Sequence, residues 1–249
     1  MFCLENPSTG CLTNRPFMRE LNAHRRVVDY CRYKCAVGGK RALSWALYPY
    51  KKPTALWTNV DFHPRRCNCP GGRHSSSMVG DRARGRRKDR GGGRSPPLSV
   101  RHTVPTELHL DILLSALEAI PGGRWVLDLF SGTQSLKIAC EMLGLEYVGV
   151  DAEESAVRPG GERVKTDLVQ DLTGCDLPLL IKRGAKVAGC RARELLLVWM
   201  SVPCTTYSQA QTINPGHLRH RDYSKPSRPA VSGLAKRHDR LVGNLVRQL

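Results

Sequence analysis

The stretch WVLDLFSGT, residues 125–133, decides the fold of this chain. It begins as an apolar run typical of a buried strand and ends in a Ser-Gly-Thr segment typical of a tight loop. Residues 134–143 then have helical spacing and stop at Gly144, and a second strand-like run, 146–150, ends at Asp151. A strand, loop, helix and strand in this order predict a crossover between parallel strands. We therefore expect an α/β protein.

Further elements are predicted on both sides of this unit. Leucines recur at helical spacing after Pro105, and Pro121-Gly122-Gly123 stops that helix. Residues 34–50 match no period and look inserted between two strands. The other predicted elements are a strand at 2–4 that ends at Glu5, a strand pair at 25–33 and 54–60, a helix at 105–120, a buried strand at 196–201 and a closing amphipathic helix at 234–249.

The chain length and a biased segment set the domain organisation. With 249 residues the chain can bury one good core, and a second full domain is not expected. Residues 63–103 are rich in Gly, Arg, Ser and Pro and offer few core residues, which indicates a basic flexible linker or small insert. We divide the chain into 1–62, the linker 63–103 and 104–249, which holds the crossover unit.

The chain is strongly basic, with a net charge of +17 and a pI of about 9.8. A charge of this sign and size suits a polyanionic partner, although it does not choose between DNA, RNA and an acidic membrane. Part of the excess lies in one run, Arg82 to Arg94, which suits non-specific phosphate contact or a solvated linker equally well.

The ten cysteines are scattered, and the first residues lack the pattern of a secretory segment, so we expect none. This pattern favours a reducing compartment, and we expect an intracellular protein that is not secreted; the nucleus and a viral or cytoplasmic compartment both stay open. No apolar run approaches the length of a membrane span, so we expect no membrane partner.

The loop after the strand at 125–130 is a candidate cofactor site. It lies where a parallel sheet binds ligands, and Gly132 lets the backbone approach a ligand closely. Asp151 ends the next strand about twenty residues on, where an acid can bind ribose hydroxyls. Asp167 is a candidate for a place near an adenine. The loop has one glycine rather than the three of a dinucleotide fingerprint, which argues against NAD.

Cys204 is the candidate nucleophile. It follows a buried strand and Pro203, within the polar turn Val202-Pro203-Cys204-Thr205-Thr206-Tyr207-Ser208. A lone cysteine is usually a small buried hydrophobic residue, but its place after an apolar strand and downstream of the cofactor loop favours chemistry. Glu5, followed by Asn6, is the candidate partner, although by itself it could equally be an exposed acid near a chain end.

These three pieces together resemble the motifs of DNA (cytosine-5)-methyltransferases: Asp-Leu-Phe-Ser-Gly at 128–132, Pro-Cys with a polar run at 203–208, and Glu-Asn at 5–6. In that family the glutamate motif follows the cysteine motif, whereas here it comes first. The resemblance therefore implies a circularly permuted Rossmann-like sheet. Tyr30-Cys31-Arg32-Tyr33 and the segment 52–59 extend the resemblance to the phage and large-virus-like branch.

The resemblance implies methyl transfer from S-adenosyl-L-methionine to carbon 5 of cytosine in duplex DNA, on a flipped base. Cys204 would attack carbon 6, Glu5 would steady ring nitrogen 3 and Asn6 would fix the backbone. Val202 stands where the family has a first proline. The cofactor residues carried over from the family are Asp128, Phe130, Ser131, Gly132, Thr133, Asp151, Asp167 and Pro203.

Two other functions stay open. The same chemistry could act on RNA, or the chain could be a catalytically decayed nucleic-acid-binding protein, as Val202, the insertion at 34–50 and the lack of a visible target-recognition region would allow. The oligomeric state and the target sequence are not encoded in any pattern that we recognise.

A zinc site is a separate candidate. His63, Cys67, Cys69 and His74, with Cys31 or Cys35 as a further donor, could hold the ion. Because Cys-x-Cys is tighter than the usual Cys-x-x-Cys spacing, the sequence alone leads us to assign no metal.

Overall fold

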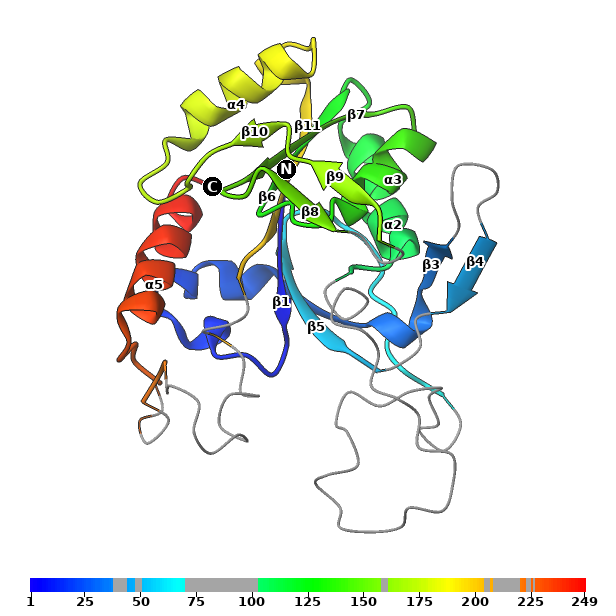
Figure 1. Cartoon of the computed structure of the whole chain (residues 1–249). Coiled ribbons are helices and arrows are strands. Elements are labelled where there is room, and N and C mark those ends of the chain that lie inside the picture. Colours follow the sequence, from blue (N-terminus) through cyan, green and yellow to red (C-terminus); the bar gives the residue numbers. More distant parts are fainter. Residues whose placement is uncertain are drawn as a thin grey trace.

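The computed structural model describes residues 1–37, 44–47, 51–69, 103–157, 161–203, 207, 220–222, 225 and 227–249. Within these residues, seven strands form one mixed sheet in the order β10-β7-β6-β11-β1-β5-β2 (Figure 1). The protein is thus α/β with a mostly parallel sheet, as the crossover at 125–151 predicts. The strands of the sheet are β1 (Phe2–Pro7), β2 (Arg25–Asp29), β5 (Pro53–Thr58), β6 (Trp125–Leu129), β7 (Glu146–Asp151), β10 (Leu168–Val169) and β11 (Leu195–Ser201).

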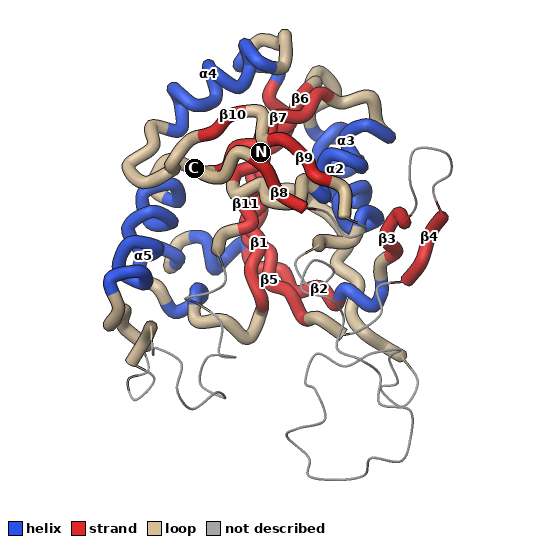
Figure 2. Tube along the Cα trace, viewed as in Figure 1, coloured by secondary structure: helices blue, strands red, loops and turns tan. Residues whose placement is uncertain are grey.

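Helices cover both faces of the sheet, which makes a three-layer arrangement (Figure 2). The helices α2 (Thr106–Ala119) and α3 (Ser135–Met142) pack on one face, and α4 (Leu177–Val187) and α5 (Gly233–Val246) pack on the other. Alternate residues of β6 supply the two cores, because successive side chains of a strand point to opposite faces. Leu127 belongs to the core under α4 and α5, and Val126 to the core under α2.

Local sequence explains where the helices begin. The Asp176 carboxylate accepts a hydrogen bond from the Leu179 amide at 2.8 Å and caps α4. The Ser232 hydroxyl caps α5 by accepting from the Ala235 amide at 3.1 Å. Helix α3 has no side-chain cap and instead follows Gln134, which has a left-handed backbone (φ 54°).

The first strand of the chain lies inside the sheet. β1 pairs in parallel with β11 and antiparallel with β5, and β5 in turn pairs antiparallel with β2. The expected pairing of the two strands within 25–33 and 54–60 is therefore confirmed, although the first of them gives way after Asp29 to a short 3-10 turn, η4 (Tyr30–Arg32). Three further 3-10 turns follow β1: η1 (Leu12–Asn14), η2 (Pro16–Met18) and η3 (Leu21–His24).

Several segments differ from the sequence-based expectation. The stretch expected to be an insertion contains two short paired strands, β3 (Lys34–Val37) and β4 (Ser44–Leu47). A second small hairpin, β8 (Ser155–Val157) with β9 (Arg163–Lys165), follows β7, and a 3-10 turn, η7 (Ala192–Glu194), precedes β11. Helix α4 and these hairpins were not expected. Most of the expected linker, from residue 70 to residue 102, lies outside the described residues.

The sheet has a point at which its strand order reverses. From β6 the chain passes to β7 on one side, and it later returns to place β11 on the other side of β6. Ligands of open α/β sheets bind beyond the carboxyl ends of the strands at such a point. The loop 130–134 leaves β6 at this place.

Candidate functional site

The candidate site lies at the carboxyl ends of β6, β7, β11 and β1. The strands β7, β6, β11 and β1 are successive neighbours in the sheet, and each pair is parallel. Their carboxyl ends therefore lie at one edge of the sheet. In register, Met200 of β11 pairs with Leu129 of β6, and Ser201 pairs with Glu5 of β1. The loop after β6 and the carboxylate of β1 therefore flank the same strand, β11.

The loop after β6 has an unusual backbone. Phe130, Gly132 and Gln134 all have positive φ angles, of 61°, 44° and 54°. Glycine adopts this region readily, whereas it is strained for phenylalanine, and such strain persists where the surroundings impose it. Two hydrogen bonds impose it here: the Ser131 amide donates to the Val150 carbonyl at 3.2 Å, and the Gly132 amide donates to Asp151 Oδ2 at 2.9 Å.

Asp128 is a buried acid at the base of this loop. Its Oδ2 accepts a hydrogen bond from the Tyr147 hydroxyl at 2.7 Å, and its Oδ1 has no partner among the described residues. Burial raises the pKa of Asp128 to about 7, and the negative charges of Asp151 and Asp167 add to the effect. The site therefore holds a carboxyl group that gains or loses its proton near neutral pH.

The other loop residues leave further polar capacity. The Ser131 hydroxyl is buried and, within the described part of the chain, has no hydrogen-bond partner. Gly149 of the neighbouring strand lies against it, because a Cβ at this position would come within 3.0 Å of Ser131 Oγ and 2.9 Å of the Tyr147 hydroxyl. Thr133 is half-buried in the same loop.

The two remaining acids of the expected cofactor site support the backbone. Asp151 holds the Gly132 amide through Oδ2 and accepts from the Glu153 amide at 3.3 Å through Oδ1. Asp167 Oδ2 accepts from the Gly149 amide at 2.8 Å. A carboxylate oxygen can accept more than one hydrogen bond, so these contacts leave acceptor capacity for a ligand. Their expected contacts with ribose and adenine stay predictions.

Glu5 is buried, with 7% of its surface exposed, which excludes the interpretation as an exposed acid near a chain end. The hydroxyl of Tyr30 donates a hydrogen bond to Glu5 Oε1 at 3.0 Å. The Lys52 ammonium lies over the Tyr30 ring, 4.7 Å from its centre. The carboxylate is thus held in one place by a tyrosine from η4.

Asn6 connects β1 with the residues before the candidate nucleophile. Its Nδ2 donates to the Val202 carbonyl at 3.3 Å, while its Oδ1 is buried with no partner among the described residues. Pro203 follows Val202 and is half-buried. Cys204 itself lies outside the described residues, so its side chain is not placed.

Tyr207, three residues after the candidate nucleophile, also contacts the segment that follows β1. The Cys11 amide donates to the Tyr207 carbonyl at 2.8 Å, and the Tyr207 ring is fully buried under the Arg221 guanidinium, 4.5 Å away. Arg221 in turn is paired with Asp239 of α5 at 2.7 Å. Val202 and Tyr207, which lie on either side of Cys204 in the sequence, therefore both contact residues that closely follow Glu5.

Sequence reasoning did not single out three residues of this region as site residues; of these, Tyr30 and His109 are buried and Tyr147 is half-buried. Tyr30 and Tyr147 hold the carboxyl groups of Glu5 and Asp128, and His109 packs edge-on against Trp199, with 4.8 Å between the ring centres. Burial lowers the pKa of His109 to about 3, so its ring is neutral. The Tyr-Cys-x-Tyr segment was the one available signal, and it pointed to family resemblance rather than to a contact.

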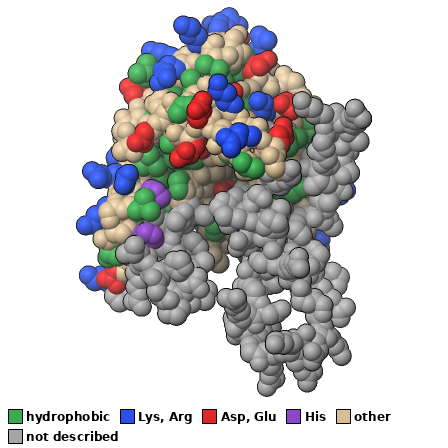
Figure 3. Space-filling view, viewed as in Figure 1, with side chains coloured by type: hydrophobic (Ala, Val, Ile, Leu, Met, Phe, Trp, Pro, Cys, Tyr) green, Lys and Arg blue, Asp and Glu red, His purple; other side chains and the backbone are tan. Residues whose placement is uncertain are grey.

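The basic side chains do not form a single patch on the described part of the face that Figure 3 shows. Lys and Arg side chains are scattered there among Asp and Glu side chains. The densest basic run, Arg82 to Arg94, lies outside the described residues. The net charge therefore remains the argument for a polyanionic partner.

Comparison with protein-family models finds no family that matches the chain, and comparison with curated proteins finds no matching relative. Within the described residues, no helix has both the length and the apolar character needed to cross a bilayer.

Proposed function

We propose that this protein is a circularly permuted DNA (cytosine-5)-methyltransferase that uses S-adenosyl-L-methionine. One observation carries the proposal: β11, which leads into the Pro203-Cys204 motif, lies between β1, which bears the buried Glu5, and β6, which leads into the cofactor loop. Three motifs far apart in the sequence thus belong to three adjacent parallel strands. This adjacency supports a pocket that the three motifs share.

The strand order supports the permutation. If residues 1–62 were placed after residue 249, the strands β6, β7, β10, β11, β1, β2 and β5 would be numbered one to seven, and the sheet would have the order 3-2-1-4-5-7-6. This order is the common doubly wound order 3-2-1-4-5-6 with one antiparallel strand added near the edge. A cut at a surface loop before β1 would keep every pairing of the sheet.

The residues of the loop fit the proposed cofactor. Asp128 Oδ1 and the Ser131 hydroxyl are buried polar atoms with no partner among the described residues, and such atoms are rare unless a ligand uses them. Gly132 has a positive φ and no side chain, which leaves room for a ligand to approach the loop backbone. When bound, the cofactor would supply an electrophilic methyl group. Asp128, Ser131 and Asp151 would hold and orient it.

The chemistry on the base would fall to Cys204 and Glu5. The sulfur of Cys204 forms a bond to carbon 6 of cytosine, and the displaced electron pair makes carbon 5 nucleophilic. A proton shared between Glu5 and ring nitrogen 3 offsets the negative charge that develops on the ring. After methylation, loss of the carbon 5 proton to a base expels the sulfur and restores the aromatic ring. Asn6 holds the Val202 backbone before Cys204, and this bond to a carbonyl does not require a proline at 202.

Methyl transfer from labelled cofactor to duplex DNA and to RNA, with Cys204→Ser as control, tests the proposal. We expect label in DNA with the wild-type protein and none with the variant. A DNA duplex that contains 5-fluorocytosine should trap a covalent adduct that survives denaturation, since the fluorine blocks the last elimination. Label in RNA alone would replace DNA by RNA as substrate. Cofactor binding without transfer or adduct would favour the decayed binding protein.

A further inference from the structure

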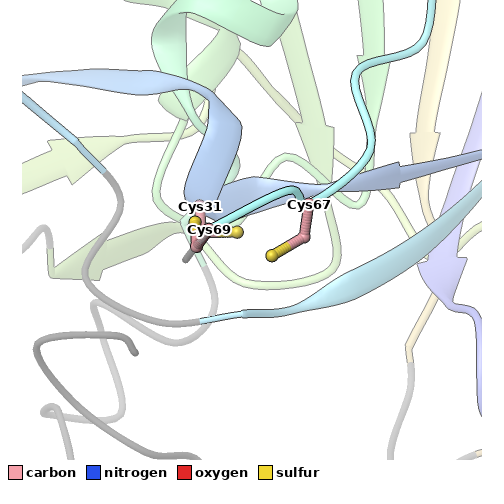
Figure 4. A group of neighbouring side chains, drawn as sticks. All are labelled: Cys31, Cys67 and Cys69. Carbon is pink, nitrogen blue, oxygen red and sulfur yellow. The ribbon is translucent and has the colours of Figure 1, made fainter. Parts of the chain in front are cut away.

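Three cysteines from two separate segments meet at one place, and none of them is among the candidate methyl-transfer residues. Cys31 belongs to η4, and Cys67 and Cys69 belong to the segment that follows β5. Their three sulfur atoms all lie within 4.8 Å of one another (Figure 4). Cys31 is buried and the other two are half-buried. Figure 4 shows the sulfur atoms of Cys67 and Cys69 turned toward each other, with Cys31 beside Cys69.

The backbone that carries these cysteines is fixed by a buried acid. Asp29, at the end of β2, accepts hydrogen bonds from the Cys67 amide and from Arg66 Nε, both at 2.9 Å, and its own amide donates to the Arg65 carbonyl at 3.0 Å. Asp29 is only 1% exposed. The approach of Cys67 to Cys31 is therefore built into the fold.

Arg65 adds a second anchor for the same segment. Its guanidinium pairs with Glu107 and Asp111 of α2, each at 2.7 Å, and lies 4.8 Å from the centre of the Tyr33 ring. Its amide donates to the Tyr33 hydroxyl at 2.9 Å. Residues on both sides of η4 are thus fastened to the segment before Cys67, so the three thiols are preorganised rather than brought together by chance contact of loose loops.

We propose that Cys31, Cys67 and Cys69 bind a structural zinc ion. A tetrahedral zinc ion with sulfur ligands at about 2.3 Å places those sulfurs about 3.8 Å apart, so small side-chain rotations would close the present arrangement on the ion. Thiolates are also the ligands that select zinc over the hard cations magnesium and calcium. The three sulfurs supply three of the four positions, and each thiol gives up its proton on binding.

The grouping corrects the choice of donors that the sequence suggests. Cys31 joins Cys67 and Cys69, whereas Cys35 is half-buried and its thiol interacts with the backbone of Thr106. His63 is exposed, and no described histidine or acid joins the three sulfurs at the same spacing. His74 lies outside the described residues.

A disulfide is the competing chemistry for neighbouring cysteines. It would join two of the three sulfurs at about 2.05 Å and would leave the third without a role. Among the described residues, no disulfide joins two cysteines. The odd number of converging sulfurs favours a metal.

The site would serve the fold next to Glu5. Cys31 directly follows Tyr30, whose hydroxyl holds the Glu5 carboxylate, and η4 has no side-chain cap of its own. A zinc ion that joins η4 to Cys67 and Cys69 would fix the position of Tyr30. This role does not depend on the reaction that the protein performs.

Elemental analysis of the full chain, purified with reductant, tests the proposal. We expect about one zinc per chain in the wild type and a background level in the double variant Cys67→Ser, Cys69→Ser. The matched controls Cys35→Ser and Cys190→Ser, which remove half-buried free thiols outside the group, should keep the metal. Zinc at wild-type level in the double variant, or copper or iron in place of zinc, would overturn the assignment.

A second measurement uses only the wild-type protein, so it does not depend on whether the cysteine variants fold. Protein stripped with a chelator and refilled with cobalt should show thiolate-to-cobalt charge transfer and the visible bands of a tetrahedral ion. Removal of zinc should lower Tm by about 5 °C or more, and zinc should restore it. Absence of the cobalt bands in reduced protein, or a disulfide among the three cysteines by mass spectrometry, would refute the site.

Discussion

The hydroxyl of Tyr30 lies 3.0 Å from Glu5 Oε1, and this hydrogen bond joins a 3-10 turn to the central strand β1. The pair is buried, so the bond fixes the carboxylate in a region with little water to replace it. Within the proposed mechanism Tyr30 acts through Glu5 and is a positioning residue.

Substitution Tyr30→Phe should slow methyl transfer while leaving cofactor binding unchanged. A hydrogen bond to a charged group contributes about 1.5–3 kcal/mol, so kcat should fall about ten- to hundredfold. Steady-state kinetics on duplex DNA measures the change, and calorimetry measures cofactor affinity. Because the effect acts through Glu5, Tyr30→Phe should cost little more in a Glu5→Gln background.

The matched control is Tyr33→Phe, since Tyr33 is buried nearby but accepts its hydrogen bond from the Arg65 amide. This variant should keep kcat near the wild-type value. Equal losses in both variants would mean that the effect is one of folding and not of Glu5 position.

Substitution Gly149→Ala should weaken cofactor binding. The new Cβ would lie 2.9 Å from the Tyr147 hydroxyl and 3.0 Å from Ser131 Oγ, so it must displace the group that holds Asp128 and the loop residue next to it. We expect a loss of stability of about 1–3 kcal/mol and a higher Kd for S-adenosyl-L-methionine. Chemical denaturation and calorimetry give the two values.

Gly122→Ala is the control for this change, because a Cβ at Gly122 meets no atom within 4 Å. It should leave both Kd and stability close to those of the wild type. If Gly149→Ala binds S-adenosyl-L-methionine with the Kd of the wild type, the loop 130–134 is not part of the cofactor site.

Asp128 should make the stability of the protein depend on pH in a direction opposite to that of a salt-bridged acid. Its pKa rises from 3.8 to about 7 on folding, chiefly through burial, so between these values the folded state holds a proton that the unfolded state has lost. The free energy of unfolding therefore falls as pH rises from about 4 to 7, by an amount on the order of a few kcal/mol.

Urea denaturation of the wild type and of Asp128→Asn across this pH range measures the contribution. His109 acts in the opposite sense, because its pKa is lowered from 6.5 to about 3 and the unfolded state binds the extra proton. Both proteins contain His109, so its contribution cancels in the difference between their free energies of unfolding. As pH rises, the wild type should lose stability relative to Asp128→Asn. A difference that does not change with pH would refute a raised pKa of Asp128.

Substitution Asn6→Ala should slow formation of the trapped adduct without changing cofactor affinity. It removes the hydrogen bond to the Val202 carbonyl, two residues before Cys204, and we expect roughly a tenfold loss from a bond worth about 1 kcal/mol or more. Time courses with 5-fluorocytosine DNA give the rate.

Asn59→Ala is the counterpart at the other end of the strand, where Asn59 Oδ1 accepts from the Phe2 amide at 2.9 Å. This change should destabilise β1 without a specific effect on the adduct. A loss of rate in Asn59→Ala as large as that in Asn6→Ala, measured at equal folded fraction, would argue against a local role for Asn6.

The regular parts of the fold could be predicted from the sequence because their periods are clean. The crossover at 125–151 has two apolar strands and one helical stripe, and the structure reproduces each within a residue or two. Helix α4 was missed because Pro178 and Gly184 interrupt it. Pro178 sits in its first turn, where proline is tolerated, and Gly184 packs against the Trp125 ring, so both suit this helix.

The sequence motifs indicate which residues belong to the candidate site, but they do not indicate which contacts those residues make. Glu5 and the loop 128–133 were proposed from the resemblance and stay predictions, and β1 lies beside β11, which is compatible with convergence of the motifs. The bond from Tyr30 to Glu5 and the meeting of Cys31 with Cys67 depend on the turn η4, whose direction follows from packing of Tyr30 and Tyr33 and not from any local period.

The pairing of Phe2 with Val198 has a consequence for how the protein is made. The partner of β1 on one side, β5, lies within the first sixty residues, but the other side of β1 is completed by a segment that leaves the ribosome almost two hundred residues later. Until then the N-terminal strands present an unpaired, apolar edge, which is the kind of surface that chaperones cover and that promotes aggregation. Such non-local parallel pairing also slows folding. Yield on expression should therefore respond to temperature and to chaperone supply more strongly than the stability of the finished sheet would suggest.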